Sequence, residues 1–268
     1  MTDRPQEGLP RIRRARGFRL YDTRGTRYLD LFRDGALLGH RGAGAVLAMK
    51  SALSQGLVAA LPSIWEKRIV SALARTFPRY REVRMYSSSE RARDAACRGI
   101  GGPVAIHDPA RGDDGGSPIT VWRPFLPTDE SAQVLLPLLP VTVGGAPAPA
   151  CFAGTVPPAV PVSDMIPAFI LAGALRGFSA FTPSIGAACP LSDPVVEKAL
   201  DTAPGWARVG PYVRAVFPES EYPRVHAEFL RAGVLLHPGY PGPSVLPGDC
   251  SPGETRLLAD LFRRIPGG

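Results

Sequence analysis

The sequence lacks long apolar runs and closely spaced cysteines. No apolar stretch approaches the roughly 18 residues of a membrane-spanning helix, the longest being Ile166 to Ala174. The four cysteines are far apart and none belongs to a Cys-x-x-Cys pair, so neither a zinc site nor a disulfide framework is indicated. The stretch from Met1 to Pro10 is polar and has no apolar signal core. We therefore expect a cytoplasmic protein with reduced cysteines.

Lysine is also scarce, although the chain is basic. Of 31 basic residues 28 are arginine, and the formal net charge is +7. Such a charge permits binding to nucleic acid or to an anionic surface, but the arginines are scattered along the chain. We interpret the densest run, residues 11–16, as a solvated strand or arm. Nucleic acid is therefore not the expected partner, and binding to an anionic polymer is the weaker alternative.

The hydrophobic residues are numerous enough to form a buried core. Of 268 residues 45% are hydrophobic, which is typical of a globular chain. Residues 17–31 predict a hairpin, because apolar and aromatic residues flank Asp22-Thr23-Arg24-Gly25 and the glycine accepts the positive φ of such a turn. Apolar residues at helical spacing then predict a helix over Ala45 to Leu57.

Two serine-rich starts mark the next elements. Ser63 and Glu66 predict a capping box for a helix from Ile64 to Phe77. The residues of this helix expected to face inward are Ile64, Ile69, Val70, Leu73 and Phe77. A strand over 82–86 then leads into Ser87, Ser88 and Ser89 and a further helix. A strand, a hydroxyl-rich turn and a helix start bring free N–H groups and the positive end of the helix dipole together, which suits a phosphate. A serine-capped helix without a ligand explains the same pattern.

The second half alternates short strands and helices. Four apolar runs separated by proline and glycine, at 104–106, 119–122, 134–143 and 150–153, predict a buried sheet with few connecting helices. Helices are expected at 163–180, 194–200 and 221–232 and from Ser251 to Arg264, with strands at 212–217 and 234–236. The helix at 163–180 is apolar on most faces, so we expect it to be buried. Ser251 and Glu254 form the second predicted capping box.

Several of these motifs together resemble a known family. Leu20-Tyr21-Asp22, Gly25, Tyr28-Leu29-Asp30-Leu31 and Leu38-Gly39-His40-Arg41 are similar to the N-terminal signature of class III pyridoxal-phosphate-dependent aminotransferases of the glutamate-1-semialdehyde aminotransferase type. The run Phe229 to Leu236 and the Ser-Pro-x-Glu helix that follows resemble the small domain of that family. The resemblance implies an α/β, fold type I aminotransferase-like protein. Its expected parts are an N-terminal arm, hairpin and helix (1–60), a shortened large domain (61–180) and a C-terminal small domain (181–268).

The same resemblance points to a cofactor site that is degenerate. The family's phosphate loop matches Ser87, Ser88 and Ser89, but Ser88 stands where the family has glycine and Arg91 where it has alanine. In the family a lysine in the large domain forms a Schiff base with the cofactor. Here the lysines fall elsewhere, Lys50 and Lys67 before the sheet and Lys198 after the helix that should follow the catalytic loop. The chain therefore resembles a family member without the Schiff-base lysine.

The family's other contacts with cofactor and substrate are not clearly matched either. The pyridine-binding aspartate could be Asp108 or Asp164, but both lie beside prolines and fit a turn or helix cap better. His107 could stack on a ring or be a simple loop histidine. His40 matches a structural part of the family's bend, and His237 ends a strand. Residues 243–245 replace the substrate-binding arginine.

These observations predict a degenerate aminotransferase-like protein with a binding or assembly role and no catalytic residues. No cofactor is expected, unless pyridoxal phosphate still binds at Ser87, Ser88 and Ser89. The alternative is an active pyridoxal-phosphate enzyme with a displaced site. The resemblance implies a homodimer or a heteromer with a related aminotransferase, and no membrane contact.

Overall fold

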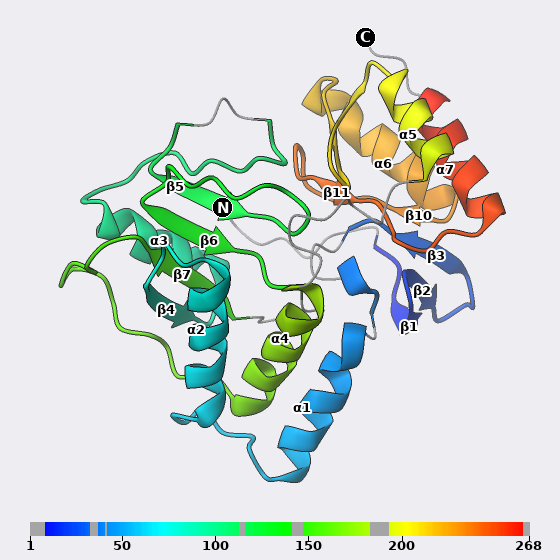
Figure 1. Ribbon diagram of the computed structural model, residues 1–268. Coiled ribbons are helices and arrows are strands. Elements are labelled where there is room, and N and C mark those ends of the chain that lie inside the picture. The colour runs from blue at the N-terminus through cyan, green and yellow to red at the C-terminus, as the bar shows by residue number, and fades with distance from the viewer. Residues whose placement is uncertain are drawn as a thin grey trace. The chain divides into compact units, whose positions relative to one another are not determined.

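The computed structural model describes residues 9–32, 37–40, 42–112, 116–140, 147–182 and 193–264. The chain forms two compact units (Figure 1). Unit 1 holds the described residues of 1–40 and 189–268, and unit 2 those of 41–188. The expected divisions at 60 and 180 differ from these. The first helix, α1 (Ala45–Ser54), packs on helix α4 (Ala168–Phe181) within unit 2.

Unit 1 is built from two small sheets and three α-helices among its described residues. One sheet has the strand order β1-β2-β3-β10 and the other the order β11-β9-β8. The elements are β1 (Ile12–Arg16), β2 (Arg19–Asp22), β3 (Arg27–Asp30), α5 (Pro194–Asp201), β8 (Trp206–Val209), β9 (Tyr212–Ala215), α6 (Tyr222–Arg231), β10 (Val234–Leu235), β11 (Ser244–Val245) and α7 (Pro252–Arg264).

The predicted hairpin is confirmed as the antiparallel pair β2–β3. The Asp22 carboxylate accepts hydrogen bonds from the backbone N–H groups of Arg24 and Thr26, both at 2.8 Å, and Gly25 has φ of +86°. Strand β10 then pairs parallel with β3, which joins the two ends of the chain in one sheet. Behind these strands an aromatic cluster forms the core of the unit, made by Trp206, Phe217, Phe229 and Phe262.

Unit 2 is a four-stranded sheet with helices. The order is β4-β7-β6-β5, with β5 and β6 parallel and the other pairs antiparallel. Helix α3 packs on β7, β4 and β6, α2 packs on β4 and α4, and α4 also packs on α1. The bounds are α1 as above, α2 (Ile64–Thr76), β4 (Glu82–Tyr86), α3 (Ser89–Gly99), β5 (Ile119–Trp122), β6 (Val134–Pro137), β7 (Ala148–Phe152) and α4 (Ala168–Phe181).

Burial explains why these segments form a sheet and a core. All residues of β5 and β6 are buried, as expected of strands covered on both faces. Next to them, Trp122 packs edge-on against Phe77 from the end of α2 and against Phe178 and Phe181 from α4. The prediction that α4 is largely buried is confirmed.

Three local predictions are corrected. The backbone of Ser63 has helix-cap geometry, but its hydroxyl makes no capping bond and, among the described residues, has no partner. The predicted capping box is therefore wrong, although the helix exists. The run 104–106 is not a strand, and pairing there is limited to a single bridge between His107 and Thr120. Ile64, expected inward, is 59% exposed. The end of the run 134–143 lies outside the described residues.

Candidate functional site

The turn between β4 and α3 has the predicted form. Ser87 follows the strand, and Ser88 is the N-cap residue of α3, with its Oγ accepting the backbone N–H of Arg91 at 3.2 Å. The carbonyl of Ser88 accepts the N–H of Ala92 at 3.1 Å. Ser88 has extended φ and ψ, −149° and 155°, so its backbone needs no glycine. The serines therefore start a helix here, which is required both by a phosphate site and by a serine-capped helix without a ligand.

A carboxylate of the same chain binds at the turn that leads into this helix. Asp164 Oδ2 accepts hydrogen bonds from the backbone N–H of Ser87 at 2.9 Å and from Ser87 Oγ at 2.7 Å. Arg91 binds the same carboxylate with both arms of its guanidinium, Nε to Oδ2 at 2.8 Å and Nη2 to Oδ1 at 2.6 Å. Two hydrogen bonds between β4 and residues 163–164 hold Asp164 in place, from Met85 N–H to Ser163 Oγ at 3.1 Å and from Asp164 N–H to the Met85 carbonyl at 2.8 Å.

The electrostatics keep Asp164 ionised. Desolvation raises the pKa of its carboxyl, but the hydrogen bonds from Arg91 and Ser87 outweigh it, and the pKa lies below its ordinary value. The same bonds raise the pKa of Arg91. Both groups are charged near neutral pH, and the N-terminal end of α3 favours the negative one.

This arrangement leaves fewer donors of the turn for the phosphate of a pyridoxal cofactor. A phosphate at a helix start needs free N–H and side-chain donors. The N–H and hydroxyl of Ser87 and two guanidinium nitrogens of Arg91 are bonded to Asp164. The Ser88 hydroxyl serves as the cap acceptor. The assignment of Ser87, Ser88 and Ser89 as a phosphate site stays a prediction, and Asp164 competes with it.

The other candidate aspartate is also engaged by arginine. Asp108 and Arg123 are 5% and 4% exposed. Arg123 donates from Nε to Asp108 Oδ1 at 2.7 Å and from Nη2 to Oδ2 at 2.8 Å. Burial raises the pKa of Asp108, but the guanidinium outweighs it and holds the pKa below its usual range. The predicted turn role is also present, since the N–H of Ala110 reaches Asp108 Oδ1 at 3.2 Å.

The histidines hold backbone segments. His40 Nε2 lies 2.7 Å from Oδ2 of the buried Asp30, and the His40 N–H donates to the Gly17 carbonyl at 2.7 Å. The motif residues Asp30 and His40 thus tie the bend to the hairpin. His107 exchanges backbone hydrogen bonds with the β5 segment. The ring of His237 packs edge-on against Phe32, and its Nδ1 lies 2.8 Å from the Gly239 carbonyl oxygen.

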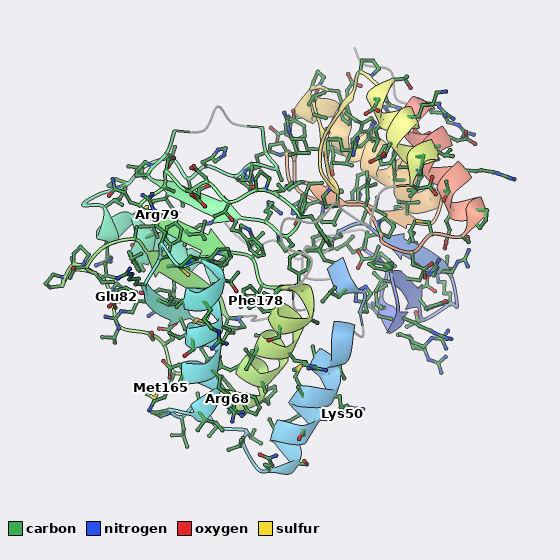
Figure 2. All side chains as sticks on the ribbon, viewed as in Figure 1. Lys50, Arg68, Arg79, Glu82, Met165 and Phe178 are labelled. Carbon is green, nitrogen blue, oxygen red and sulfur yellow. The ribbon has the colours of Figure 1, made fainter. Side chains whose placement is uncertain are left out.

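The lysines all lie exposed on helices: Lys50 on α1, Lys67 on α2 and Lys198 on α5 (Figure 2 labels Lys50). None of them belongs to the hydrogen-bonded group around Asp164. Within the described ranges no His, Cys, Asp and Glu side chains gather as metal ligands. No helix among the same residues has the length and apolar character needed to cross a bilayer.

The contact between Asp164 and Ser87 could not be predicted from the sequence. Its partner Ser87 lies 77 positions away, and no periodicity links residues at that distance. A carboxylate beside a proline predicts a cap or turn, but not which segment it caps. The nearest sequence signal is Arg91 itself, an arginine in place of the family's alanine, whose guanidinium can bind a carboxylate with two hydrogen bonds.

Solved structures of aminotransferases share the fold. An omega-transaminase from Sphaerobacter thermophilus aligns with a TM-score of 0.67 at 15% identity, over 96% of this chain and 90% of that one. A beta-phenylalanine aminotransferase from Variovorax paradoxus aligns with a TM-score of 0.69 at 14% identity, over 95% of this chain and 86% of that one. A glutamate-1-semialdehyde-aminomutase from Pseudomonas aeruginosa PAO1 aligns with a TM-score of 0.65 at 15% identity, over 96% of this chain and 87% of that one. The protein therefore has the fold type I aminotransferase fold, which confirms the predicted fold class.

Sequence comparison identifies closer relatives. No model of a known family matches the chain. A protein of Treponema pallidum (strain Nichols), described as "Uncharacterized protein", is 30% identical over 288 residues, covering 88% of this chain and 89% of its own length. One from Borreliella burgdorferi, with the same description, is 33% identical over 90 residues, or 33% of this chain and 34% of its own. The chain belongs to the same family as the Treponema pallidum protein.

Proposed function

We propose that this protein is an aminotransferase-like binding or assembly protein that does not catalyse transamination. The observation that carries the proposal is the Asp164 carboxylate at the start of α3. It takes the hydrogen bonds of Ser87, one of the three serines that the family resemblance assigns to the cofactor phosphate, and it also binds Arg91. An internal carboxylate on these donors favours a stable turn over a ligand site.

The lysine positions support the same proposal. Transamination needs a lysine amine that binds the cofactor covalently and moves protons. Lys50 and Lys67 are exposed on α1 and α2, on helices that precede the sheet, and Lys198 belongs to the other compact unit. A catalytic amine is usually desolvated or held beside another charge, which lowers its pKa. Solvent exposure of all three lysines argues against that role.

The test is an absorbance spectrum of the purified protein mixed with pyridoxal phosphate, followed by borohydride reduction and peptide mass mapping. We expect free cofactor to be recovered and no lysine to be modified stoichiometrically. A stoichiometric adduct on one of the three lysines would overturn the proposal and establish the alternative, an active pyridoxal-phosphate enzyme with a displaced site.

For the assembly role we propose a homodimer, or a heteromer with a related aminotransferase, in the cytoplasm. Support comes from apolar side chains on the stretch from α1 to the start of α2. Leu47 is 72% exposed, Leu61 62% and Ile64 59%. Exposed apolar groups concentrated in one stretch of chain are typical of an interaction surface. Binding to an anionic polymer remains the weaker alternative, and a steep loss of affinity with added salt would support it.

A further inference from the structure

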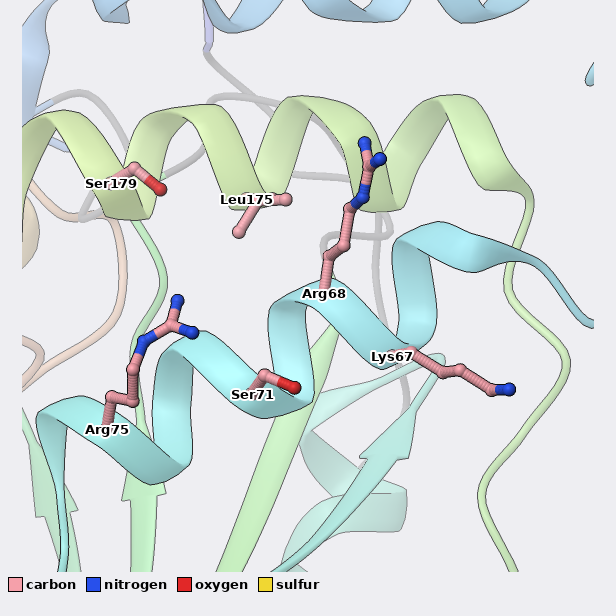
Figure 3. Close-up of a pocket in the computed structure, with 6 residues that line it drawn as sticks. All are labelled: Lys67, Arg68, Ser71, Arg75, Leu175 and Ser179. Carbon is pink, nitrogen blue, oxygen red and sulfur yellow. The ribbon is translucent and has the colours of Figure 1, made fainter.

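A groove lies between α2 and α4 in unit 2 (Figure 3). Its volume is about 430 Å³. Helix α2 supplies most of the lining and α4 the rest: Lys67, Arg68, Ser71 and Arg75 from the first, Leu175 and Ser179 from the second. The groove is separate from the β4–α3 turn, with which it shares no residue. Its lining is therefore free of the hydrogen bonds that occupy that turn.

The helix geometry places two guanidinium groups along this groove. Arg68 and Arg75 are seven residues apart, which is two turns and roughly 10.5 Å along the axis. Figure 3 shows both side chains reaching from α2 toward α4, with the Ser71 hydroxyl between them on the same helix and Ser179 across from Arg75. Lys67 points away from the other two cations along the outside of α2. The groove thus offers cations at both ends and hydroxyl groups between and opposite them.

The charge of the groove is not neutralised within the described chain. Three cations line it and no carboxylate does. Across the described ranges, no Asp or Glu forms an ion pair with Lys67, Arg68 or Arg75. The guanidinium carbon of Arg68 also lies over the Trp65 ring, 5.0 Å from its centroid. Neighbouring like charges repel one another, and a bound anion would relieve the repulsion.

We propose that this groove binds a chain of linked phosphate groups, either a free oligophosphate or the phosphate chain of a nucleotide. Guanidinium groups bind phosphate oxygens in pairs, and the serine hydroxyls donate to the remaining oxygens. Arg68 and Arg75 are two turns of helix apart, so a single phosphate cannot bind both of them closely, whereas linked phosphates give each arginine its own group. Leu175 alone lines the groove with apolar surface, so recognition depends on charge.

Isothermal titration calorimetry of the full chain tests this site. We expect tripolyphosphate and a nucleoside triphosphate to bind with similar affinity, and inorganic phosphate at least about tenfold more weakly, because it loses one or more charge-assisted contacts. The double variant R68Q/R75Q is expected to bind tripolyphosphate at least about tenfold more weakly than the unmodified protein. A triphosphate that binds much more tightly than tripolyphosphate would identify the nucleotide as the source.

The control is R93Q/R256Q, which removes two exposed helix arginines that pair with no carboxylate in the described part of the chain. It should bind as the unmodified protein does. R68K/R75K keeps the charge and loses the paired bonds, so its affinity should fall between those of the unmodified protein and R68Q/R75Q. Equal weakening in R93Q/R256Q, no binding of either phosphate chain, or binding of a single-stranded oligonucleotide alone would overturn the proposal. None of these outcomes depends on whether pyridoxal phosphate binds at the β4–α3 turn.

Discussion

At the scale of single residues, carboxylates bound by arginines recur in both units. Asp164 with Arg91, Asp108 with Arg123 and, in unit 1, Glu254 with Arg19 are two-armed pairs. Each pair joins segments that are distant along the chain or fixes a loop next to a strand. Since paired guanidinium bonds are directional, they define the geometry of these joints as well as contributing charge.

The Asp164 pair leads to a prediction about stability. In D164N the charge-assisted bonds from Ser87 and Arg91 are weakened, and we expect the free energy of unfolding near pH 7 to fall by about 1–2 kcal/mol. The measurement is chemical denaturation followed by circular dichroism. D94N is the matched control, because Asp94 forms an exposed pair with Arg98 on the same helix and such pairs contribute about 0.5 kcal/mol or less.

The pH dependence provides a second readout of the same variant. The folded-state pKa of Asp164 lies below its ordinary value. The ionised carboxylate therefore contributes fully to the free energy of unfolding at pH values above the unfolded-state pKa of about 3.9. It is lost as the pH falls through the folded pKa. The stability difference between the unmodified protein and D164N should therefore shrink below about pH 4. A difference that is absent at pH 7, or that grows in acid, would contradict the assigned role of Asp164.

At the scale of elements, α7 shows how one carboxylate joins a helix to a sheet. Glu254 is 6% exposed and accepts the backbone N–H of Ser251 at 2.8 Å, while Ser251 Oγ accepts the N–H of Glu254 at 3.3 Å. This confirms the predicted capping box. Arg19 from β2 binds the same carboxylate at 2.9 and 2.6 Å, and its side-chain bond is the main cause that lowers the pKa of Glu254 to about 2.

Glutamine at this position should destabilise the protein at neutral pH. We expect E254Q to lower the free energy of unfolding by about 2–3 kcal/mol at pH 7. Because folding lowers the pKa of Glu254, its ionised carboxylate stabilises the protein above the unfolded-state pKa. This stabilisation is lost as the pH falls from about 4.5 to about 2. D249N is the control, since Asp249 binds the same arginine at 3.2 Å but is 69% exposed and should contribute less than about 1 kcal/mol. Similar effects of the two variants would refute this account.

Much of the element order could be predicted from the sequence, because it depends on local signals. The hairpin turn at Asp22 to Gly25, the cap at Ser251 and the apolar spacing of α2 and α4 are local, and the structure has these elements. Ser63 has the same capping pattern as Ser251 but makes no capping hydrogen bond, because the pattern does not determine the orientation of the serine hydroxyl. The strand β8 was missed because it is short and is defined by its pairing with β9.

The candidate site was less predictable, for a physical reason. The serines at the start of α3 were found because a cap is a local pattern. What occupies the helix start depends on Asp164, whose position is fixed by backbone bonds to Met85 that form only after residues 163–164 pass beside β4. The groove between α2 and α4 likewise exists only once the two helices pack, and the spacing of Arg68 and Arg75 alone does not reveal it.

At the scale of the whole molecule, the assembly proposal predicts a defined oligomer. Sedimentation velocity should give a mass of about twice 28.5 kDa for a homodimer. L47E/I64E places charges on the exposed apolar stretch and should yield a monomer, because buried unpaired charges are costly. V195E is the control, an exposed apolar side chain on α5. A monomeric unmodified protein, or dimers unaffected by L47E/I64E, would contradict the use of this surface for a homodimer.

The central claim is that the chain's own carboxylate takes the place of a cofactor phosphate, and equilibrium dialysis against pyridoxal phosphate tests it most directly. For the unmodified protein the account predicts no saturable binding at the β4–α3 turn. For D164A, in which the donors of Ser87 and Arg91 are released, it predicts measurable binding that disappears when Arg91 is also replaced by glutamine. Saturable, stoichiometric binding to the unmodified protein that D164A leaves unchanged would contradict the account.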